Sequence, residues 1–537
     1  MLFKHLLRVL PIVLAVALLA ACGAAPAAEP ARELALTVPT QNAEAPDDNS
    51  RVFYEIFVGS FSDSDGDGTG DLRGIIDRLD YLNDGNPDSG LSLGVEGIWL
   101  TPIFQSRSYH KYNVADYYAI DEKFGTMEDL DALIAACHER GIKLILDLVI
   151  NHTDLMHEWF SAFTKAHRNG DTSDPCYDYY CYYHRGETAP AGRSFSQLSG
   201  TDDFYECNFS GDMPELNFDN PAVRQGVLDI AKFYLERGVD GFRFDAAKYV
   251  YFGDNPRSAE FWEWYMDELR AIKPDGFYIA EVWDGDGVTE QYYFAMDCFN
   301  FTVSQSSGVI AEAAKGGKAS RYTGYVESYL NEIQTLRADA LYAPFLTNHD
   351  MDRAAGFLNA EKGELQMAAN LYLLGPGAPF IYYGEELGMR GSRGGANTDA
   401  NRRLKMVWGD DDTVADPSGT TYSADNRAAQ TAAEAMLDEN SIYNYYKNVL
   451  MIRRANPEIA RGTYQSLAID QGKLGGFTST WNGNTVCVLH NPSKSAETVD
   501  VSKLGGFTTL AAVAGDAEAA LDGTTLTIPG QTSVVLR

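Results

Sequence analysis

The stretch Val239-Asp-Gly-Phe-Arg-Phe-Asp-Ala-Ala-Lys248 has the pattern of a buried β-strand that ends in charged residues. Apolar side chains recur along it, and Arg243 and Asp245 are separated by one residue, so both point to the same side of a strand. A guanidinium beside a carboxylate keeps that carboxylate ionised at a low pKa, which suits a nucleophile better than a proton donor. The alternative is a purely structural Arg–Asp pair, and the rest of the chain decides between the two.

Repeated apolar segments around this stretch predict a parallel sheet covered by helices. Segments with the length and composition of buried strands lie at 52–58, 94–100, 141–150, 239–245, 276–283, 298–303, 341–347 and 378–383. Helical periodicity is expected at 126–140, 221–237, 258–272, 320–336, 363–374 and 441–455. Eight strands that alternate with helices predict an α/β fold, a (β/α)₈ TIM barrel over 51–152 and 216–455, with its chemistry at the C-terminal strand ends.

Two further regions break the strand–helix alternation. Residues 153–215 are rich in Tyr, Asp, Ser and Gly and show no long periodic element, so we expect a small domain inserted after the third strand. Residues 456–537 carry short alternating strands between Gly and Asn turns, which predicts a C-terminal antiparallel β-sandwich.

The bulk composition limits the classes of function. The chain has 537 residues, 45% hydrophobic and 12% aromatic, enough for two to four domains with a large core. Its net charge of −33 argues against nucleic acid as a partner, since that needs basic patches. A neutral substrate, an exported protein and carboxylate metal sites are all compatible with this charge. A monomer is favoured, although the sequence does not define the oligomeric state.

The N-terminus has the features of a processing segment. A short basic region precedes an apolar run at 9–20 that is too short to cross a membrane comfortably. The run ends in Leu19-Ala-Ala-Cys-Gly23, which resembles a bacterial lipobox, in which Cys22 is lipidated. We therefore expect a signal peptide over 1–22, a flexible linker over 23–50 and an exported, membrane-anchored bacterial lipoprotein. An ordinary signal peptide cut near Ala21, which would give a secreted protein, is the alternative.

The remaining cysteines divide into two groups. Cys176 and Cys181 share a Tyr-rich loop, and in an oxidising compartment a disulfide between them is plausible, with Cys207 as an alternative partner. Cys137, Cys298 and Cys487 lie in apolar patterns and are expected to be buried thiols.

Polar residues gather where the predicted strands end. The third strand ends at Asn151-His152, the fourth at Arg243 and Asp245, the fifth at Glu281-Val-Trp283, and the seventh at Asn348-His349-Asp350. Because parallel strands of a barrel end at one rim, the carboxyl groups of Asp245, Glu281 and Asp350 should face one cleft.

These four strand ends resemble the four conserved regions of the α-amylase family of glycoside hydrolases (family 13). Met213-Pro-Glu-Leu-Asn217 resembles an extra region of that family, and Ala378-Pro-Phe-Ile-Tyr-Tyr-Gly-Glu-Glu386 resembles its eighth-strand stretch. The resemblance covers about residues 51–537. The Met213–Asn217 stretch lies between the forms typical of oligo-1,6-glucosidases and neopullulanases.

The resemblance assigns the three carboxyl groups to retaining glycoside hydrolysis. Asp245 would be the nucleophile, Glu281 the general acid/base and Asp350 the group that stabilises positive charge in the transition state. Apolar neighbours of Glu281 agree with this role, because desolvation raises the pKa of a carboxyl group.

By the same resemblance, a further set of side chains would contact the substrate. His152 and His349 would bind the sugar in the cleaved subsite, Tyr112 would stack under it, and Lys248 would bind beyond the cut; we add Arg243 and Trp283 to this set. Asn113 stands where exo-acting α-glucosidases of the family carry Asp, which favours endo-action on α-1,4 chains of starch and maltodextrins. A cyclomaltodextrinase/neopullulanase, a 4-α-glucanotransferase and, more remotely, a non-catalytic surface glucan-binding protein are the alternatives.

One loop has the spacing of a calcium site. Oxygen-bearing residues occupy alternate positions of a Gly-rich stretch, namely Asp63, Asp65, Asp67, Thr69 and Asp71, with Thr69 offering its backbone carbonyl. An ordinary Asp/Gly turn is the alternative reading, and a related loop in parts of the family supports Ca²⁺. Asn151 stands where many members of the family place a second calcium ligand.

Overall fold

The computed structural model describes residues 49–409, 411–469 and 471–537. The predicted signal peptide, Cys22 and nearly all of the predicted linker lie outside these residues. Among the described residues, no helix has the length and apolar character needed to cross a membrane.

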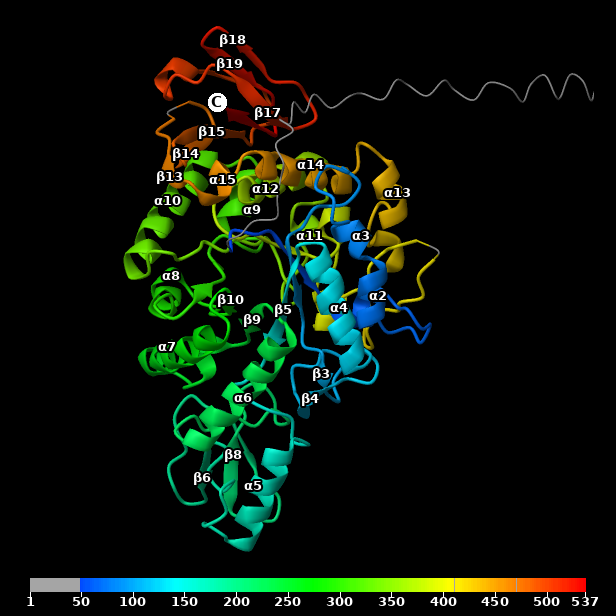
Figure 1. The fold of residues 1–537 in the computed structure, drawn as a ribbon, viewed down its shortest axis with the longest axis vertical. Helices are drawn as coiled ribbons and strands as arrows, with labels where there is room; N and C mark the ends of the chain where they lie inside the picture. Colours follow the sequence, from blue (N-terminus) through cyan, green and yellow to red (C-terminus); the bar gives the residue numbers. More distant parts are fainter. Residues whose placement is uncertain (1–48, 410, 470) are drawn as a thin grey trace, which may run out of the picture. The chain divides into compact units, whose positions relative to one another are not determined.

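A curled parallel sheet of seven strands forms the barrel (Figure 1). Its order is β11–β10–β9–β5–β2–β1–β12, and every neighbouring pair is parallel. The strands are β1 (Phe53–Ile56), β2 (Gly97–Leu100), β5 (Lys143–Leu148), β9 (Gly241–Phe244), β10 (Phe277–Ala280), β11 (Asp297–Cys298) and β12 (Phe380–Tyr382). Seven of the eight predicted strands are therefore present, each shorter than predicted.

The predicted strand 341–347 is wrong as a regular strand, although the chain still closes the barrel there. Single bridges join Phe299 to Ala343 and Phe345 to Phe380, in the gap between β11 and β12. Pro344 lies between the two bridges, and a proline has no N–H group to donate to a ladder. The fold is thus a (β/α)₈ barrel whose seventh strand is reduced to two bridges.

Helices follow the strands largely where the periodicity predicts them. The main ones are α4 (Met127–Glu139), α6 (Pro221–Arg237), α7 (Asn255–Ile272), α10 (Ala319–Leu336), α12 (Lys362–Leu373) and α14 (Ile442–Ala455). Helix α4 begins at a capping box in which Thr126 and Asp129 each bind the other's backbone N–H.

Aromatic side chains fill the interior of the barrel. The core includes Phe53, Trp99, Phe277, Phe299, Phe345 and Phe380. Gly241 opens β9 with φ +144°, and a Cβ there would lie 1.8 Å from the carbonyl oxygen of Phe277. Only glycine therefore allows β9, which leads into Asp245, to lie this close to β10.

The inserted region 153–215 contains a helix that the sequence pattern did not reveal. Helix α5 (Glu158–Asn169) packs beside a three-stranded sheet of β6 (Tyr182–His184), β8 (Asp203–Glu206) and β7 (Phe195–Gln197) (Figure 1). The expectation of no long element was wrong: the four buried positions of the helix, Phe160, Phe163, Ala166 and His167, recur at helical spacing within a region whose overall composition is that of loops.

The predicted disulfide is absent, because Cys176 and Cys181 are free thiols in the structure. The Cys181 Sγ atom points to the carbonyl oxygen of Leu216 at 3.5 Å, and the backbone N–H of Cys176 binds Asp174. Cys207, the alternative partner, donates to Ser196 at 3.2 Å. Cys137, Cys298 and Cys487 are buried thiols, as predicted.

The C-terminal region forms an antiparallel β-sandwich. Its five-stranded sheet has the order β13–β14–β15–β20–β17, and its three-stranded sheet has the order β16–β19–β18. The strands are β13 (Thr463–Ser466), β14 (Gly475–Trp481), β15 (Asn484–Asn491), β16 (Glu497–Asp500), β17 (Leu510–Ala514), β18 (Ala520–Asp522), β19 (Thr525–Ile528) and β20 (Thr532–Leu536). A shared apolar core lies between the sheets and contains Leu489, Leu526 and Val534.

Candidate active site

One buried guanidinium lies at the centre of the strand ends. The Nη1 atom of Arg243 lies 2.7 Å from Oδ1 of Asp245 and 2.8 Å from Oδ1 of Asp147, and its Nη2 lies 3.1 Å from Oε2 of Glu281. The Arg243 side chain has no exposed surface. A single cation thus holds carboxyl groups from three adjacent strands, β5, β9 and β10, close together.

The environment of Asp245 corrects its expected pKa. Burial raises the pKa of Asp245 above its ordinary value, and Arg243 opposes that effect without reversing it. Because burial outweighs the attraction of the guanidinium, Arg243 does not hold Asp245 at the low pKa expected for a solvent-exposed pair.

Glu281 is held beside Asp245 by the backbone as well as by Arg243. The N–H group of Ala246 donates to Glu281 Oε2 at 2.9 Å, and Ala246 adopts a left-handed conformation with φ +45°. Burial raises the pKa of Glu281, Arg243 lowers it, and the charges of Asp245 and Asp350 add to the increase. A raised pKa for Glu281 was the prediction, and it is confirmed.

Asp350 lies in a different electrostatic environment. Burial alone would raise its pKa, but His349 and Arg403 bring it well below the ordinary value. The Nη2 atom of Arg403 lies 2.6 Å from Oδ1 of Asp350, and Nε2 of His349 lies 3.1 Å from Oδ2. The site therefore combines one carboxylate kept ionised with two carboxyl groups whose pKa is raised.

His349 lies behind the site and not on its surface. Its side chain has no exposed surface, and Nδ1 lies 2.6 Å from Oε1 of Glu55. Burial opposes its protonation, yet Asp350 and Glu55 raise the pKa of His349 to about 10. Neither Arg243 nor His349 lines the cavity, and both side chains are fully buried. Their direct contact with a sugar stays a prediction.

A cavity of about 780 Å³ opens onto the carboxyl groups. Among the predicted residues, it is lined by Tyr112, His152, Asp245, Lys248, Glu281, Trp283 and Asp350. The side chain of Trp283 is 40% exposed and stacks on Phe301 at 5.2 Å. The volume of the cavity lies within the range of ordinary ligand sites.

Hydrogen bonds hold the lining side chains in place. Tyr112 donates to Oδ2 of Asp147 at 2.8 Å, and its ring stacks on His349 at 5.3 Å. Lys248 donates to the carbonyl oxygen of Trp283 at 2.8 Å. Burial lowers the pKa of His152 to about 4, so this imidazole is neutral at pH 7.

The structure adds site residues that the strand-end argument did not find. Arg403 and Asp399 line the cavity from a segment beyond β12. Within the barrel, Asp147 binds Arg243, and Glu55 binds His349. Asp147 and Glu55 each interrupt an apolar strand, and a charged residue in a buried strand is a signal that points to a partner. Arg403 gives no such signal, because its segment has no strand or helix pattern.

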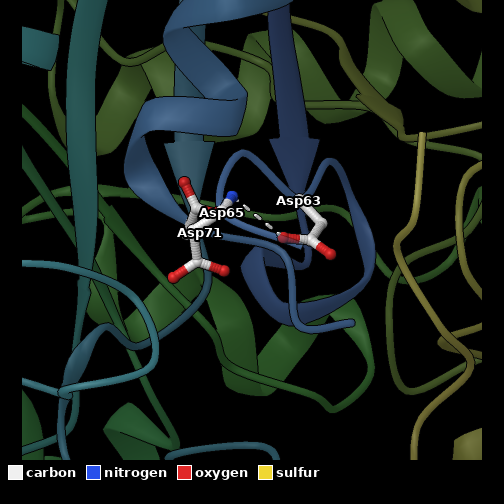
Figure 2. A group of neighbouring side chains, drawn as sticks. All are labelled: Asp63, Asp65 and Asp71. Atoms are coloured by element: carbon white, nitrogen blue, oxygen red, sulfur yellow. Dashed lines mark hydrogen bonds between the residues drawn. The ribbon is translucent and has the colours of Figure 1, made fainter. Parts of the chain in front are cut away.

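The predicted calcium loop brings three of its five residues together. Ligand oxygens of Asp63, Asp65 and Asp71 all lie within 4.8 Å of one another, and Figure 2 shows the three side chains around one loop. Asp67 is not part of this group, and its Oδ1 accepts from the backbone N–H of Thr69 at 2.6 Å. An oxygen-only donor set of this kind fits a hard cation such as Ca²⁺.

Asn151 also lies among buried oxygens. Its Oδ1 atom and Oε2 of Glu215 are both buried without a hydrogen-bond partner among the described residues. Burial, followed by the charge of Glu206, raises the pKa of Glu215 well above its ordinary value. Unpartnered buried oxygens beside acidic groups fit a cation, so the residues here are compatible with the second metal site.

Comparisons with known proteins agree with this geometry. Residues 55–462 match the family model described as "Alpha amylase, catalytic domain". The chain is 36% identical over 453 residues to Alpha-amylase 3 of Dictyoglomus thermophilum, covering 83% of this chain and 85% of that protein. It is 34% identical over 358 residues to a 4-alpha-glucanotransferase of Thermotoga neapolitana, covering 65% of this chain and 74% of that protein. The solved structure of Eubacterium rectale Amy13B superposes with a TM-score of 0.84 at 37% identity, covering 92% of this chain and 96% of that one.

Proposed function

The chain belongs to the α-amylase family of glycoside hydrolases, and we propose that it is an endo-acting α-amylase that cleaves α-1,4 bonds of starch and maltodextrins with retention. The observation that carries the proposal is the single guanidinium of Arg243, which holds Asp245 and Glu281 side by side at the floor of the cavity. Retaining hydrolysis needs two carboxyl groups at a separation of about 5 Å.

In the proposed reaction the two carboxyl groups alternate in role. Asp245 attacks the anomeric carbon of the sugar in the cleaved subsite, while Glu281 donates its proton to the leaving glycosidic oxygen. The covalent glycosyl–Asp245 ester is then attacked by water, from which Glu281 removes a proton. The raised pKa of Glu281 supports the first step, because a protonated carboxyl group is needed there.

Asp350 and its cations have a separate role in this proposal. The ionised carboxylate of Asp350 lies at the cavity, where positive charge develops on the sugar in the transition state. Arg403 and His349 keep this carboxylate charged and fix its position. Tyr112 and Trp283 supply flat apolar surface for sugar rings, and Lys248, which lies beside Trp283, supplies a hydrogen-bond donor.

Asn113 supports endo-action. Its side chain is 2% exposed, and its Nδ2 donates to Oδ2 of Asp154 at 2.5 Å. The amide is thus turned into the protein and offers no carboxylate that would grip a chain end in the cavity. A protein that lacks such a contact is suited to binding the interior of a longer chain.

The test compares starch, pullulan and cyclodextrin with one enzyme preparation, followed by chromatography of the products. We expect mixed maltooligosaccharides from starch at early times, with the α-anomer released first. A single short product from starch, faster cleavage of cyclodextrin or pullulan, or no cleavage of any α-glucan would each contradict the proposal.

The second candidate is a 4-α-glucanotransferase, which the similarity to the Thermotoga neapolitana protein favours. Both reactions proceed through the same ester on Asp245 and differ only in whether water or a sugar hydroxyl attacks it. Incubation with maltotetraose alone separates them. Products longer than the substrate would indicate transfer, and shorter products alone would indicate hydrolysis.

We further propose that Asp63, Asp65 and Asp71, together with the Thr69 carbonyl, bind a structural Ca²⁺. The convergence of three carboxylates in one loop supports this site. Asp63 is partly buried, which would raise its pKa, but hydrogen bonds from Thr413 and from loop amides hold the pKa below its ordinary value. An ionised carboxylate is the form that binds a cation. Asn151 and Glu215 are the candidates for a second ion.

We also propose that the protein is exported and anchored to the bacterial membrane through lipid on Cys22, because the sequence up to that residue has lipobox character. Metabolic labelling with a radioactive fatty acid tests this. Label in the full-length protein that is lost in Cys22→Ser, together with release from the membrane fraction, is the expected result. Equal labelling of the two proteins would contradict it.

A further inference from the structure

The three-stranded sheet of the inserted domain has two unlike faces. One face packs against α5, where the Tyr205 ring lies 5.1 Å from Phe160 and the Tyr182 ring lies 5.9 Å from Phe163. These contacts make that face part of a small core. Side chains alternate between the faces of a strand, so the neighbours of these tyrosines point the other way.

The opposite face carries three half-buried rings, Tyr183, Phe195 and Phe204, which we call the aromatic face. Tyr183 on β6 is paired with Phe204 on β8, and their rings stack at 5.0 Å with an interplanar angle of 13°. Phe195 on β7 lies 4.8 Å from Tyr183, edge-on. Among the described residues, these three rings make ring contacts only with one another, and each of them is partly exposed to solvent.

A line of aromatic rings also leaves the catalytic cavity on the side of the inserted domain. Phe209, which lines the cavity and is 45% exposed, lies 4.9 Å from Tyr249. Tyr249, also at the cavity, lies 5.4 Å from Phe252. The apolar lining of the cavity therefore continues outward from the carboxyl groups to Phe252.

Arg193 joins this line to the aromatic face. Its guanidinium lies 5.8 Å from the centre of the Phe252 ring and donates to the Phe252 carbonyl oxygen at 3.1 Å. Its Nη1 atom also lies 2.8 Å from Oε2 of Glu206, the residue paired with Phe195 in the sheet. Side-chain contacts thus run from the cavity through Phe252 and Arg193 to Glu206, which is the strand partner of Phe195 in the sheet.

We propose that the aromatic face is a binding site for α-1,4-glucan, occupied by the part of a long chain that extends beyond the catalytic cavity. This inference rests on the proposed function, which places the chain in the cavity. Sugar rings present apolar C–H faces that pack on flat aromatic rings, and their hydroxyls need donors and acceptors beside those rings. Arg185, which lies 5.6 Å from the Phe204 ring, and Gln197 of β7 supply such groups.

Charge supports a neutral occupant. The net charge of −33 repels acidic partners, whereas an uncharged glucan approaches without electrostatic cost. At the inner edge of the aromatic face the charge of Arg193 is balanced by Glu206. We identify the aromatic face as a glucan-binding site because contacts connect it to the cavity, and not only because its rings are partly exposed.

The experiment uses the full chain with Tyr183→Ala and Phe204→Ala combined, because these two rings lie farthest from the catalytic groups along the path. We expect kcat/KM for long amylose to fall about 5- to 10-fold, mainly through KM, since each lost aromatic contact weakens binding about 2- to 10-fold. With maltotetraose, which is too short to extend from the catalytic groups to the aromatic face in the proposed binding mode, kcat/KM should change less than about twofold. An equal fall for both substrates, or no fall for amylose, would overturn the inference.

Binding is measured separately in native gels that contain amylopectin, with Asp245→Asn present in every variant so that the gel is not digested. We expect retardation of the Asp245→Asn protein and loss of most of it when the two rings are removed. Tyr118→Ala, which removes a 49% exposed ring on β4 (Asp116–Ile120), is the matched control and should leave retardation unchanged. Retardation that is the same with and without the two rings would also overturn the inference.

Two further variants protect the result against misfolding. Tyr183→Phe keeps a flat ring and should behave as wild type, and Phe204→Leu keeps apolar volume while removing the ring and should behave as the alanine variant. Failure of the proposed function is distinguishable: a wild-type protein that is retarded by amylopectin but cleaves no α-glucan contradicts catalysis and leaves the aromatic face supported.

Discussion

The Nη1 atom of Arg243 lies 2.7 Å from Oδ1 of Asp245, and neither side chain has more than 11% of its surface exposed. The same guanidinium also binds Asp147 and Glu281, so three buried carboxyl groups share one positive charge. Like charges held this close cannot all be ionised at low cost, which favours a proton on one of them near neutral pH. This is the condition that a nucleophile and a proton donor in one site require.

Removal of either reacting carboxyl group should abolish turnover while the fold remains. We expect Asp245→Asn and Glu281→Gln each to lower kcat on soluble starch by about three orders of magnitude or more. Asp229→Asn, on the exposed face of α6, is the matched isosteric control and should keep full activity. A variant at Asp245 that cleaves as fast as wild type would remove the nucleophile assignment.

Arg243→Gln should destabilise the protein as well as inactivate it. Without the guanidinium, three buried carboxyl groups lose their cation, and we expect the free energy of unfolding to fall by about 3–5 kcal/mol. Arg257→Gln breaks an ion pair to Asp219 whose side chains are 48% and 56% exposed, and it should cost less than about 1 kcal/mol. Urea unfolding measures the free energy of unfolding of both variants. Equal decreases in the two variants would contradict the expectation that the buried ion pairs contribute more to stability than the exposed pair.

The alkaline limb of the kcat/KM profile should report Glu281. Burial raises the pKa of this group, so its proton is retained above the ordinary pH range of a glutamic acid and lost as pH rises further. A glycosyl fluoride, whose leaving group needs no protonation, should be cleaved without this limb. The assignment of Glu281 as the acid fails if the limb is the same for starch and the fluoride.

Stability should fall between about pH 7 and pH 10 through His349. Its pKa is raised in the folded protein to about 10, above the ordinary value of 6.5, so its contribution is complete below pH 6.5 and is lost as pH rises towards 10. Melting temperatures measured across this range should decrease in wild type and decrease less in His349→Gln. If the melting temperatures of the two proteins decrease in parallel, deprotonation of His349 is not the cause of the loss of stability at alkaline pH.

Chelation should lower the melting temperature through the Asp63–Asp71 loop. We expect EDTA to destabilise the wild type and added Ca²⁺ to restore it, as mass action requires for a ligand of the native state. Asp71 is an unsuitable probe because its Oδ1 caps α2 (Leu72–Asp77) by accepting from Gly74 N at 2.7 Å. Asp65, which is exposed, is the better position: Asp65→Ala removes its ligand oxygen and should remove the EDTA effect, whereas Asp88→Ala, at another exposed position, should keep it.

The sequence by itself determined the barrel, the helix α6 at 221–237 and the three carboxyl groups at strand ends of one rim. This was possible because periodicity reports which face of a segment is buried, and because parallel strands of one barrel end at a common rim. Helix α5 was missed, since the surrounding region is rich in Tyr, Asp, Ser and Gly and one of the four buried positions of the helix is the polar His167.

Only the tertiary structure decided which charges meet. Arg403 reaches Asp350 from 53 positions further along the chain, and Arg243 is divided among three carboxyl groups where the sequence showed one pair. The structure also placed Tyr183, Phe195 and Phe204 together on one face of the inserted sheet. The physical reason is common to all three: a pKa or a contact depends on every group that surrounds a side chain in space, and local sequence patterns carry information only about neighbours along the chain.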